Sequence, residues 1–250
     1  MSEHELADGT ALVTGASRGF GRGIATALHK AGAQVVGVAR DRAALEEVRA
    51  ELGESFIAVA ADAADPTVAG QLIDAYHPRI LVLNAGASPL LRPLQHHSWE
   101  TFSVNWHTDV RIAFYWLRES LLTPLRPGSR VVVVSSGAAL AGSPLSGGYA
   151  GAKATQRFIT GYAQDEATRA GLGITFTAVL PRLTPLTDLG RPAVEAYAAR
   201  AGQSVEEYLR QLGGPLSPEQ AGKAVVELVT GPGPDQDGYL LTAAGLGPLP

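Results

Sequence analysis

The chain has 250 residues, of which 46% are hydrophobic, and a formal net charge of -4 at pH 7. This size suits one large α/β domain or two small ones, and the mildly acidic balance argues against a nucleic-acid-binding surface. The absence of cysteine excludes a disulfide framework and a thiolate metal site. The first residues, MSEHELADG, do not resemble a secretory signal, and no apolar run is long enough to span a membrane, so we expect a cytoplasmic protein without membrane association.

Short apolar runs alternate with helix-length amphipathic segments along the chain. Continuous runs rich in Val, Ile and Leu are typical of strands that are buried on both faces, as in a parallel sheet. We expect strands at residues 11–13, 34–39, 56–60, 80–83, 130–134, 174–180 and 239–241. We expect helices at residues 21–31, 43–52, 68–76, 99–122 and 149–170. This alternation predicts an α/β fold, a Rossmann-like doubly wound parallel sheet of about seven strands with helices on both faces.

The segment after the sixth expected strand differs from the rest of the chain. Residues 183–216 contain three prolines and a helical stretch near residues 193–212. Because ligands bind at the carboxyl edge of an open α/β sheet, we expect this segment to be a substrate lid. The alternative is a surface excursion without a role. No linker divides the chain, so residues 1–250 are expected to form a single domain.

A glycine-rich loop joins the first expected strand to the first expected helix. It reads TGASRGFG from Thr14 to Gly21, and Ile24 occupies the place of the third glycine in a GxGxxG pattern. Glycine lets the backbone approach a pyrophosphate closely, and a helix N-terminus attracts its negative charge. A glycine-rich turn alone is weak evidence, but the order strand, loop, helix predicts a dinucleotide site.

The end of the second expected strand distinguishes NAD from NADP. NAD sites place Asp or Glu there for the ribose 2′-hydroxyl, whereas an arginine accommodates a 2′-phosphate. This strand ends at Ala39, which cannot hold a hydroxyl; Arg40 follows, and Arg18 stands in the glycine loop. Two guanidinium groups that converge on one phosphate favour NADP(H). The alternative is that Arg40 is solvated and that Asp41 is the acid or a helix N-cap.

Tyr149 and Lys153 lie four residues apart, where a helix is expected to begin near Gly148. Residues at this spacing share one helix face, so the ammonium would stand beside the phenol and favour the phenolate. Such a phenol is a proton donor and acceptor suited to a carbonyl or an alcohol. An isolated pair of this kind is usually an ordinary exposed pair. Here a nucleotide loop precedes it, and Ser135 and Ser136 follow the fifth expected strand.

Five motifs stand in a fixed order along nearly the whole chain. They are TGxxxGxG at residues 14–21, Asn84-Ala85-Gly86 after the fourth strand, Asn105 in a helix, Ser136 thirteen residues before Tyr149, and YxxxK at residues 149–153. In these motifs the chain resembles the short-chain dehydrogenase/reductase family, in its compact single-domain branch. Each motif is modest evidence alone, and all five in order are highly specific.

The resemblance implies a catalytic set made of Asn105, Ser136, Tyr149 and Lys153. Tyr149 would exchange a proton with the substrate oxygen, and Ser136 would orient and polarise that oxygen. Lys153 would tune Tyr149 and bind the nicotinamide ribose, while Asn105 would hold a water that links Lys153 to solvent. Ser135 is expected to bond only to backbone. The implied cofactor contacts are Gly15, Ser17, Arg18, Gly19, Phe20, Gly21, Arg40, Asp62, Ala63, Asn84, Ala85, Gly86, Pro181 and Thr184.

The chain departs from the family pattern after the sixth strand. The family usually has Pro-Gly there, and this chain has Pro181-Arg182, which puts a bulky charged residue where chain and nicotinamide run close. The family's threonine that contacts the carboxamide has two candidates here, Thr184 and Thr187, and the spacing does not decide between them.

Several polar residues receive no role in this interpretation. The histidines His96, His97 and His107 have no obvious carboxylate partners, so we expect no metal site. Asp109 and Asp188 are expected to be surface charges without partners. The aromatic residues of the expected helix 99–122 are more typical of core than of interface. We expect a homodimer or homotetramer on the resemblance alone.

These observations together predict an enzyme. We expect an NADP(H)-dependent oxidoreductase that interconverts a ketone or aldehyde and a secondary or primary alcohol by hydride transfer, with Tyr149 as general acid/base. Residues 1–250 would form one dinucleotide-binding catalytic domain. The apolar character of the lid favours a small or medium apolar ketone as substrate. The alternatives are an NAD-dependent alcohol dehydrogenase of the same family and a dinucleotide sensor without turnover.

Overall fold

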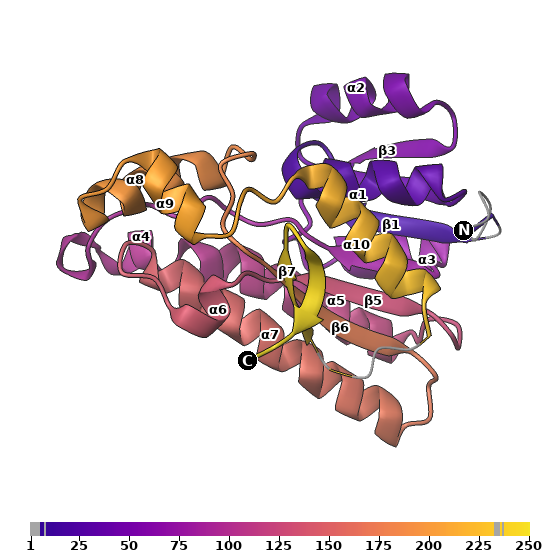
Figure 1. Cartoon of the computed structure of the whole chain (residues 1–250). Helices are drawn as coiled ribbons and strands as arrows, with labels where there is room; N and C mark the ends of the chain where they lie inside the picture. The colour runs from indigo at the N-terminus through magenta and orange to yellow at the C-terminus, as the bar shows by residue number, and fades with distance from the viewer. Residues whose placement is uncertain (1–5, 8, 233–235, 237) are drawn as a thin grey trace.

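A parallel β-sheet lies between two layers of helices in the computed structural model of the chain, which describes residues 6, 7, 9–232, 236 and 238–250 (Figure 1). In this part of the chain the sheet has eight strands in the order β3-β2-β1-β4-β5-β6-β7-β8. The strands are β1 (Thr10–Thr14), β2 (Gln34–Ala39), β3 (Phe56–Ala60), β4 (Ile80–Leu83), β5 (Arg130–Val134), β6 (Thr175–Pro181), β7 (Gly238–Thr242) and β8 (Gly245–Pro248). Strands β1 to β7 pair in parallel, and β8 returns antiparallel to β7.

The helices connect successive strands across both faces of the sheet. They are α1 (Gly19–Lys30), α2 (Arg42–Leu52), α3 (Val68–Tyr76), α4 (Trp99–Phe102), α5 (Arg111–Leu122), α6 (Ala138–Ala141), α7 (Gly147–Arg169), α8 (Gly190–Ala201), α9 (Val205–Gln211) and α10 (Pro218–Thr230). A short 3-10 helix, η1 (Leu94–His96), and a π-helical segment, η2 (Trp106–Val110), complete the order. In the part of the chain described here, no helix is long and apolar enough to cross a membrane.

The predicted doubly wound parallel sheet is confirmed. All seven expected strands are present, with ends within about two residues of those predicted from apolar runs. The eighth strand was not expected, because its sequence, GLGP, has two glycines and a proline and so lacks a strand pattern. It forms because Ala243 and Ala244 turn the chain back onto β7.

Two of the expected helices are not continuous in the structure. The expected helix 99–122 is divided into α4, η2 and α5, and the π-helical turn η2 turns Asn105 and Asp109 toward backbone groups after β4. The expected helix 193–212 is two helices, because Gly202 and Gln203 separate α8 from Ser204, which begins α9 with a capping box.

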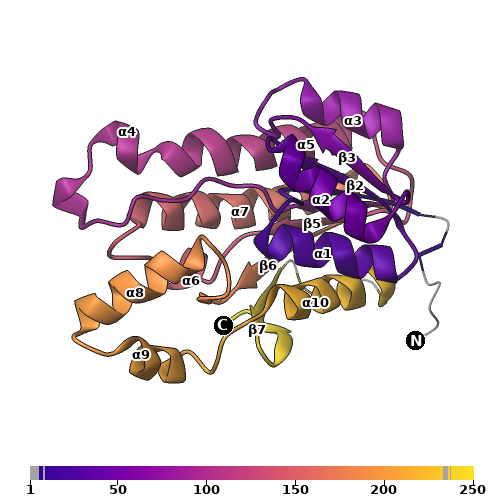
Figure 2. The same ribbon diagram turned by 90° about the horizontal axis from the view of Figure 1, so that it is seen from above.

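Helix α10 was not expected, although its start has a clear signal. The hydroxyl of Ser217 accepts a hydrogen bond from the backbone of Gln220, the side-chain oxygen of Gln220 accepts one from the backbone of Ser217, and Pro218 occupies the first helical position. The helix packs a buried apolar face on an apolar cluster of the sheet. It lies beside α1, as Figure 2 shows from above.

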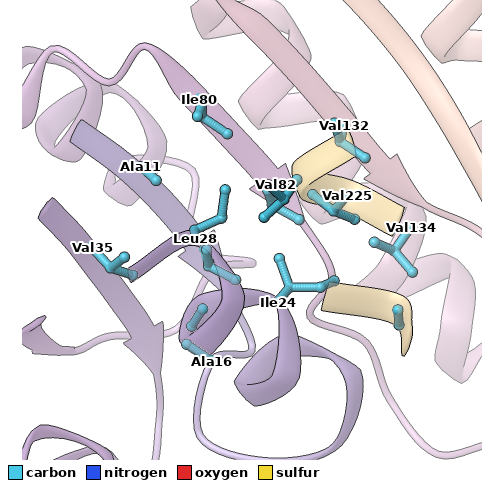
Figure 3. Close-up of a cluster of buried hydrophobic side chains, with 14 of the residues drawn as sticks. Ala11, Ala16, Ile24, Leu28, Val35, Ile80, Val82, Val132, Val134 and Val225 are labelled. Carbon is cyan, nitrogen blue, oxygen red and sulfur yellow. The ribbon is translucent and has the colours of Figure 1, made fainter. Parts of the chain in front are cut away.

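Two separate apolar clusters fill the space between the sheet and its two helix layers. One joins the sheet to α1, α2 and α10, and Figure 3 shows Ile24 and Leu28 of α1 packed among Val82, Val134 and Val225. The other joins the opposite face to α3, α5 and α7 and contains the fully buried Trp116. The sheet is therefore apolar on both faces, which explains why its central strands read as unbroken Val, Ile and Leu.

The lid helices lie outside both clusters. Figures 1 and 2 show α8 and α9 (orange) beyond the sheet, at the side where the parallel strands end. No residue of α8 or α9 belongs to either of the two clusters among the described residues. The carboxyl edge of the sheet is thus covered by two helices that contribute to neither cluster.

Truncation of Ile24 tests the packing of the first cluster. Ile24→Ala removes a buried side chain between α1 and the sheet and should lower the free energy of unfolding by about 2–5 kcal/mol, measured by urea denaturation. Leu94→Ala is the control, since Leu94 is 72% exposed, and its effect should stay within about 0.5 kcal/mol. Equal effects of the two changes would contradict this packing.

Candidate active site

A cleft of about 1040 Å³ lies at the carboxyl edge of the sheet, between the strand ends and the lid. Ser136, Tyr149 and Lys153 line it, whereas Asn105 is buried behind it. Of the fourteen residues predicted to contact a cofactor, Gly21 alone does not line the cleft. The thirteen that do are Gly15, Ser17, Arg18, Gly19, Phe20, Arg40, Asp62, Ala63, Asn84, Ala85, Gly86, Pro181 and Thr184. The folded chain therefore brings the predicted sets together.

Close packing against the neighbouring strand end fixes the glycine loop. A Cβ atom on Gly21 would lie 2.0 Å from the backbone oxygen of Gly15 and 2.5 Å from Nδ2 of Asn84, so no other residue fits there. Asn84 Nδ2 donates to the backbone oxygens of Thr14 and Gly15 at 3.3 and 3.4 Å. Gly21 thus shapes the loop from behind, and Asn84 holds the loop backbone in place.

The N-terminus of α1 opens into this cleft without a side-chain cap. Arg18 is the N-cap residue and makes no capping hydrogen bond, and none of the residues in the first turn is acidic. The first-turn N–H groups of a helix have no partner within the helix, and they attract anions. Gly19 and Phe20, which begin the helix, line the cleft. The residues present therefore fit a pyrophosphate.

The groups at the end of β2 bear on the choice between NAD and NADP. Arg40 is exposed and lines the cleft, while the carboxylate of Asp41 caps α2 by accepting a hydrogen bond from the backbone of Ala44 at 3.1 Å. Arg18 is also exposed, and it lies 3.7 Å from Asp188, which is therefore not the unpartnered charge that we expected. Since both members of that pair are mostly solvated, the pair stabilises little.

The two serines after β5 have different surroundings. Ser135 is buried, and its hydroxyl donates to the backbone oxygen of Lys153 at 2.8 Å, so it bonds only to backbone as expected. The hydroxyl of Ser136 accepts a hydrogen bond from the backbone of Ala138 at 3.2 Å and lines the cleft with Tyr149. Its own proton remains available to a ligand in the cleft.

Lys153 is almost fully buried and is paired with an acid that the sequence analysis misplaced. Asp109 was expected to be a surface charge without a partner, and this is wrong: its side chain is 1% exposed and its Oδ2 lies 3.2 Å from Nζ of Lys153. Burial lowers the pKa of Lys153, but Asp109 and Tyr149 raise it by more, so the pKa of this ammonium stands above its ordinary value. The Nζ atom lies 5.5 Å from the ring centroid of Tyr149.

Asn105 holds the same region together from behind the cleft. Its Nδ2 donates to the backbone oxygen of Ala87 at 2.7 Å and to Oδ1 of Asp109 at 3.3 Å. Oδ1 of Asp109 also accepts a hydrogen bond from the backbone of Ala87 at 2.8 Å. The side chains of Asn105 and Asp109 therefore meet at the backbone of Ala87, which lies after β4.

Arg182, which replaces the glycine of the family pattern, lines the cleft and is tied to the lid. Arg182 Nη1 donates to the backbone oxygen of Leu212, which follows the last helix of the lid, at 3.3 Å. Thr184 is buried, and its hydroxyl accepts from the backbone of Leu186 at 3.3 Å. Thr187 lies against Gly19 of the glycine loop, and its hydroxyl accepts from the backbone of Gly190 at 3.0 Å. Both threonines line the cleft.

A cluster of hydroxyl groups joins the lid to the chain before α7, and the sequence analysis did not identify it. Oη of Tyr197 in α8 contacts Oγ of Ser143 and lies 3.1 Å from Oγ of Ser146. The two serine hydroxyls lie 2.7 Å from each other, and the ring of Tyr197 stacks on Tyr208 of α9. All four side chains line the cleft. Nothing in the local sequence signals this cluster, because its members come from three segments.

The remaining residues without a predicted role lie apart from the cleft. In the described part of the chain, no group of three or more His, Cys, Asp or Glu residues could hold a metal ion. His97 lies 3.1 Å from the hydroxyl of Thr101 and packs edge-on against Phe102. The aromatic residues of the expected helix 99–122 differ in burial: Trp116 is in the core, whereas Phe114 is exposed.

Comparison with known proteins agrees with the fold and the motifs. The family model described as short chain dehydrogenase matches residues 9–198. The chain is 34% identical over 187 residues to a hydroxynaphthalene reductase-like protein of Metarhizium majus, over 70% of this chain and 68% of the relative. It is 31% identical over 230 residues to versicolorin reductase 1 of Aspergillus parasiticus, over 87% of this chain and 86% of the relative.

A solved structure gives the same result. The 3-ketoacyl-(acyl-carrier-protein) reductase of Brucella melitensis, solved in complex with NADH, is 25% identical and superposes with a TM-score of 0.74, over 91% of this chain and 92% of that one. The chain therefore belongs to the short-chain dehydrogenase/reductase family of oxidoreductases.

Substitution of Gly21 tests the shape of the loop. Gly21→Ala places a methyl group 2.0 Å from a backbone oxygen, so the loop must move and cofactor should no longer raise the melting temperature. Gly70→Ala in α3 is the matched control, because the added carbon would make an ordinary 3.5 Å contact with the side chain of Glu119 in α5. That variant should keep the cofactor response and gain up to about 1 kcal/mol of stability. Retention of the response by Gly21→Ala would contradict the assigned role of the loop.

Proposed function

We propose that the protein is an NADP(H)-dependent oxidoreductase that interconverts a ketone or aldehyde and the corresponding alcohol. The observation that supports this most is that Ser136, Tyr149 and Lys153 line the same cleft as the glycine loop. The nicotinamide, when bound, supplies or accepts the hydride, and the protein supplies position and electrostatics. The curated relatives above are named as reductases or as reductase-like.

The side chains of the cleft handle the proton and the substrate oxygen. Tyr149 gives its phenolic proton to the carbonyl oxygen in reduction and takes a proton back in oxidation. Ser136 donates a hydrogen bond to the same oxygen and polarises it. The ammonium of Lys153 favours the phenolate form of Tyr149, and it lines the cleft, where it would hold the ribose of the cofactor. Asn105 positions the turn from which Asp109 projects.

Two arginines and a capping acid support NADP(H) over NAD(H). Arg18 and Arg40 both line the cleft with exposed guanidinium groups that can bind a 2′-phosphate. The carboxylate of Asp41 is engaged as a helix cap, so it does not serve as the acid that an NAD site requires. The alternative, NAD(H), has the support that the Brucella melitensis reductase was solved with NADH.

The lid side of the cleft supports a substrate with a polar group. The hydroxyls of Ser143, Ser146 and Tyr197 bond to one another there and line the cleft, so they can also exchange hydrogen bonds with a polar group, which the apolar ketone expected from the sequence does not offer beyond its carbonyl. We therefore propose a carbonyl substrate that also has a hydroxyl or a similar group. Residues 183–216 act as its lid in a single catalytic domain.

We also propose that the protein assembles as a homodimer or homotetramer. Phe114 of α5 and Phe158 and Tyr162 of α7 are exposed, and the two helices pack side by side (Figure 2). Exposed aromatic side chains on adjacent helices are typical of an interface.

Removal of one oxygen atom tests the role of Tyr149. Tyr149→Phe should lower kcat for carbonyl reduction by about 100-fold or more, because the proton donor is lost. Cofactor binding, measured by the shift in melting temperature, should persist. Tyr162→Phe removes the same atom from an exposed tyrosine of α7 and should leave kcat unchanged. Full activity of Tyr149→Phe would exclude this mechanism.

Melting with each nucleotide tests the cofactor. NADPH at 100 times its dissociation constant should stabilise the protein by about 2.7 kcal/mol, and NADH at the same concentration should do so less. Arg40→Asp should reverse this order. Arg49→Asp makes the same charge change near the other end of α2 and should leave the order intact. A larger response to NADH in the unaltered protein would establish the NAD alternative, and no response to either nucleotide would favour a protein without turnover.

A further inference from the structure

Asp109 is a buried charge to which the family motifs assign no role. It lies in the π-helical segment η2, and its side chain is 1% exposed. Its Oδ2 atom is 3.2 Å from Nζ of Lys153, whose side chain is 6% exposed. Both ions have left water, so each depends on the other as its counter-charge.

The surroundings of Asp109 fit a carboxylate closely. Oδ1 accepts hydrogen bonds from the backbone of Ala87 and from Asn105, while the backbone oxygen of Asp109 accepts one from Nε2 of Gln156 at 2.8 Å. Oδ2 accepts no hydrogen bond from another residue in the described part of the chain, so it faces the ammonium alone. A Cβ atom on Gly86 would lie 2.7 Å from Oδ2, so the glycine of the Asn84-Ala85-Gly86 motif leaves the space that this carboxylate occupies.

Few other charges act on the ammonium. In the part of the chain that is described, the charged or titratable side chains that act on Lys153 are Asp109 from η2 and Tyr149 from α7. The end of β5 contributes the backbone oxygen of Val134 at 3.3 Å and the neutral Ser135. Among the described residues, Asp109 is therefore the only side chain with a full negative charge that offsets the burial of this ammonium.

We propose that Asp109 is a positioning residue of the reaction, whose carboxylate fixes Lys153 in the cleft and keeps it as an ammonium ion beside Tyr149. Burial alone favours the neutral amine, which does not stabilise a phenolate. The inference rests on the proposed function for the reaction that Lys153 assists, but the ion pair itself can be tested without turnover.

A structural role alone is the competing explanation. In that case Asp109 would matter only because Oδ1 anchors the backbone of Ala87. Asp109→Asn keeps an oxygen acceptor of the same size for this backbone N–H and removes the negative charge. The two explanations therefore differ in what this variant does to the ionisation of Lys153.

The small number of lysines makes that ionisation directly measurable. The chain has three, Lys30, Lys153 and Lys223, so protein labelled with ¹³C and ¹⁵N lysine gives three side-chain signals, which Lys30→Arg and Lys223→Arg assign. In the unaltered protein, the midpoint of the Lys153 titration should lie above the ordinary lysine value of about 10.4. In Asp109→Asn it should fall by about one to three pH units, since burial remains and the counter-charge is gone.

Gln156→Leu is the matched control. It removes the hydrogen bond to the backbone of Asp109 but leaves the carboxylate, so the Lys153 midpoint should stay high. A midpoint in Asp109→Asn equal to that of the unaltered protein would overturn the proposal. If Asp109→Asn does not fold, the unaltered protein decides, because a Lys153 midpoint well below about 10.4 would mean that burial outweighs the carboxylate.

The dependence of turnover on pH then separates this proposal from the proposed function. In alcohol oxidation, kcat/KM of Asp109→Asn should decline at alkaline pH as Lys153 loses its proton, and the unaltered protein should show this decline only at higher pH. Identical profiles would overturn the link to the reaction. A shifted Lys153 titration in a protein that oxidises no alcohol would instead refute the proposed function and leave the ion pair in place.

Discussion

The hydroxyl of Thr14 connects the two central strands at the edge where the cleft opens. This fully buried group donates to the backbone oxygen of Val82 at 3.4 Å and accepts from the backbone of Asn84 and Ala85 at 3.0 and 3.2 Å. The glycine loop and the segment after β4 are therefore placed by one side chain. The shape of the glycine loop and the position of Asp109 depend on that placement, because Asn84 holds the loop backbone and Gly86 leaves room for the carboxylate of Asp109.

The buried ion pair of Asp109 and Lys153 makes the fold no more stable than apolar side chains would. Loss of one partner of such a pair typically costs about 3–5 kcal/mol, whereas apolar side chains of the same volume would be as stable or more so. A pair of this kind is retained only where its geometry is fixed, and here the backbone of Ala87 and the amide of Asn105 fix it. The polar network between η2 and α7 thus makes the position of Lys153 definite at some cost in stability.

Most of the fold could be predicted from the sequence, because apolar periodicity reports directly on burial. The strands are short and continuous in Val, Ile and Leu, and the helix starts have glycine or capping signals. Within the candidate site, the spacing of the sequence motifs identified Ser136, Tyr149 and Lys153, which line the cleft. Local pattern could not show that Asp109 is buried, since its burial depends on the glycine at 86 and on a helix more than forty residues further on.

In the described part of the chain the lid helices α8 and α9 contribute to neither apolar cluster, and this has a consequence for local stability. Polar contacts connect this region to the rest of the chain, among them Arg182 with the backbone of Leu212 and Tyr197 with two serines. Sub-global opening is cheapest where few buried apolar contacts are broken. Amide protons of α8 and α9 can therefore exchange with solvent while those of the central strands remain protected, so the lid and the core behave as separate cooperative units.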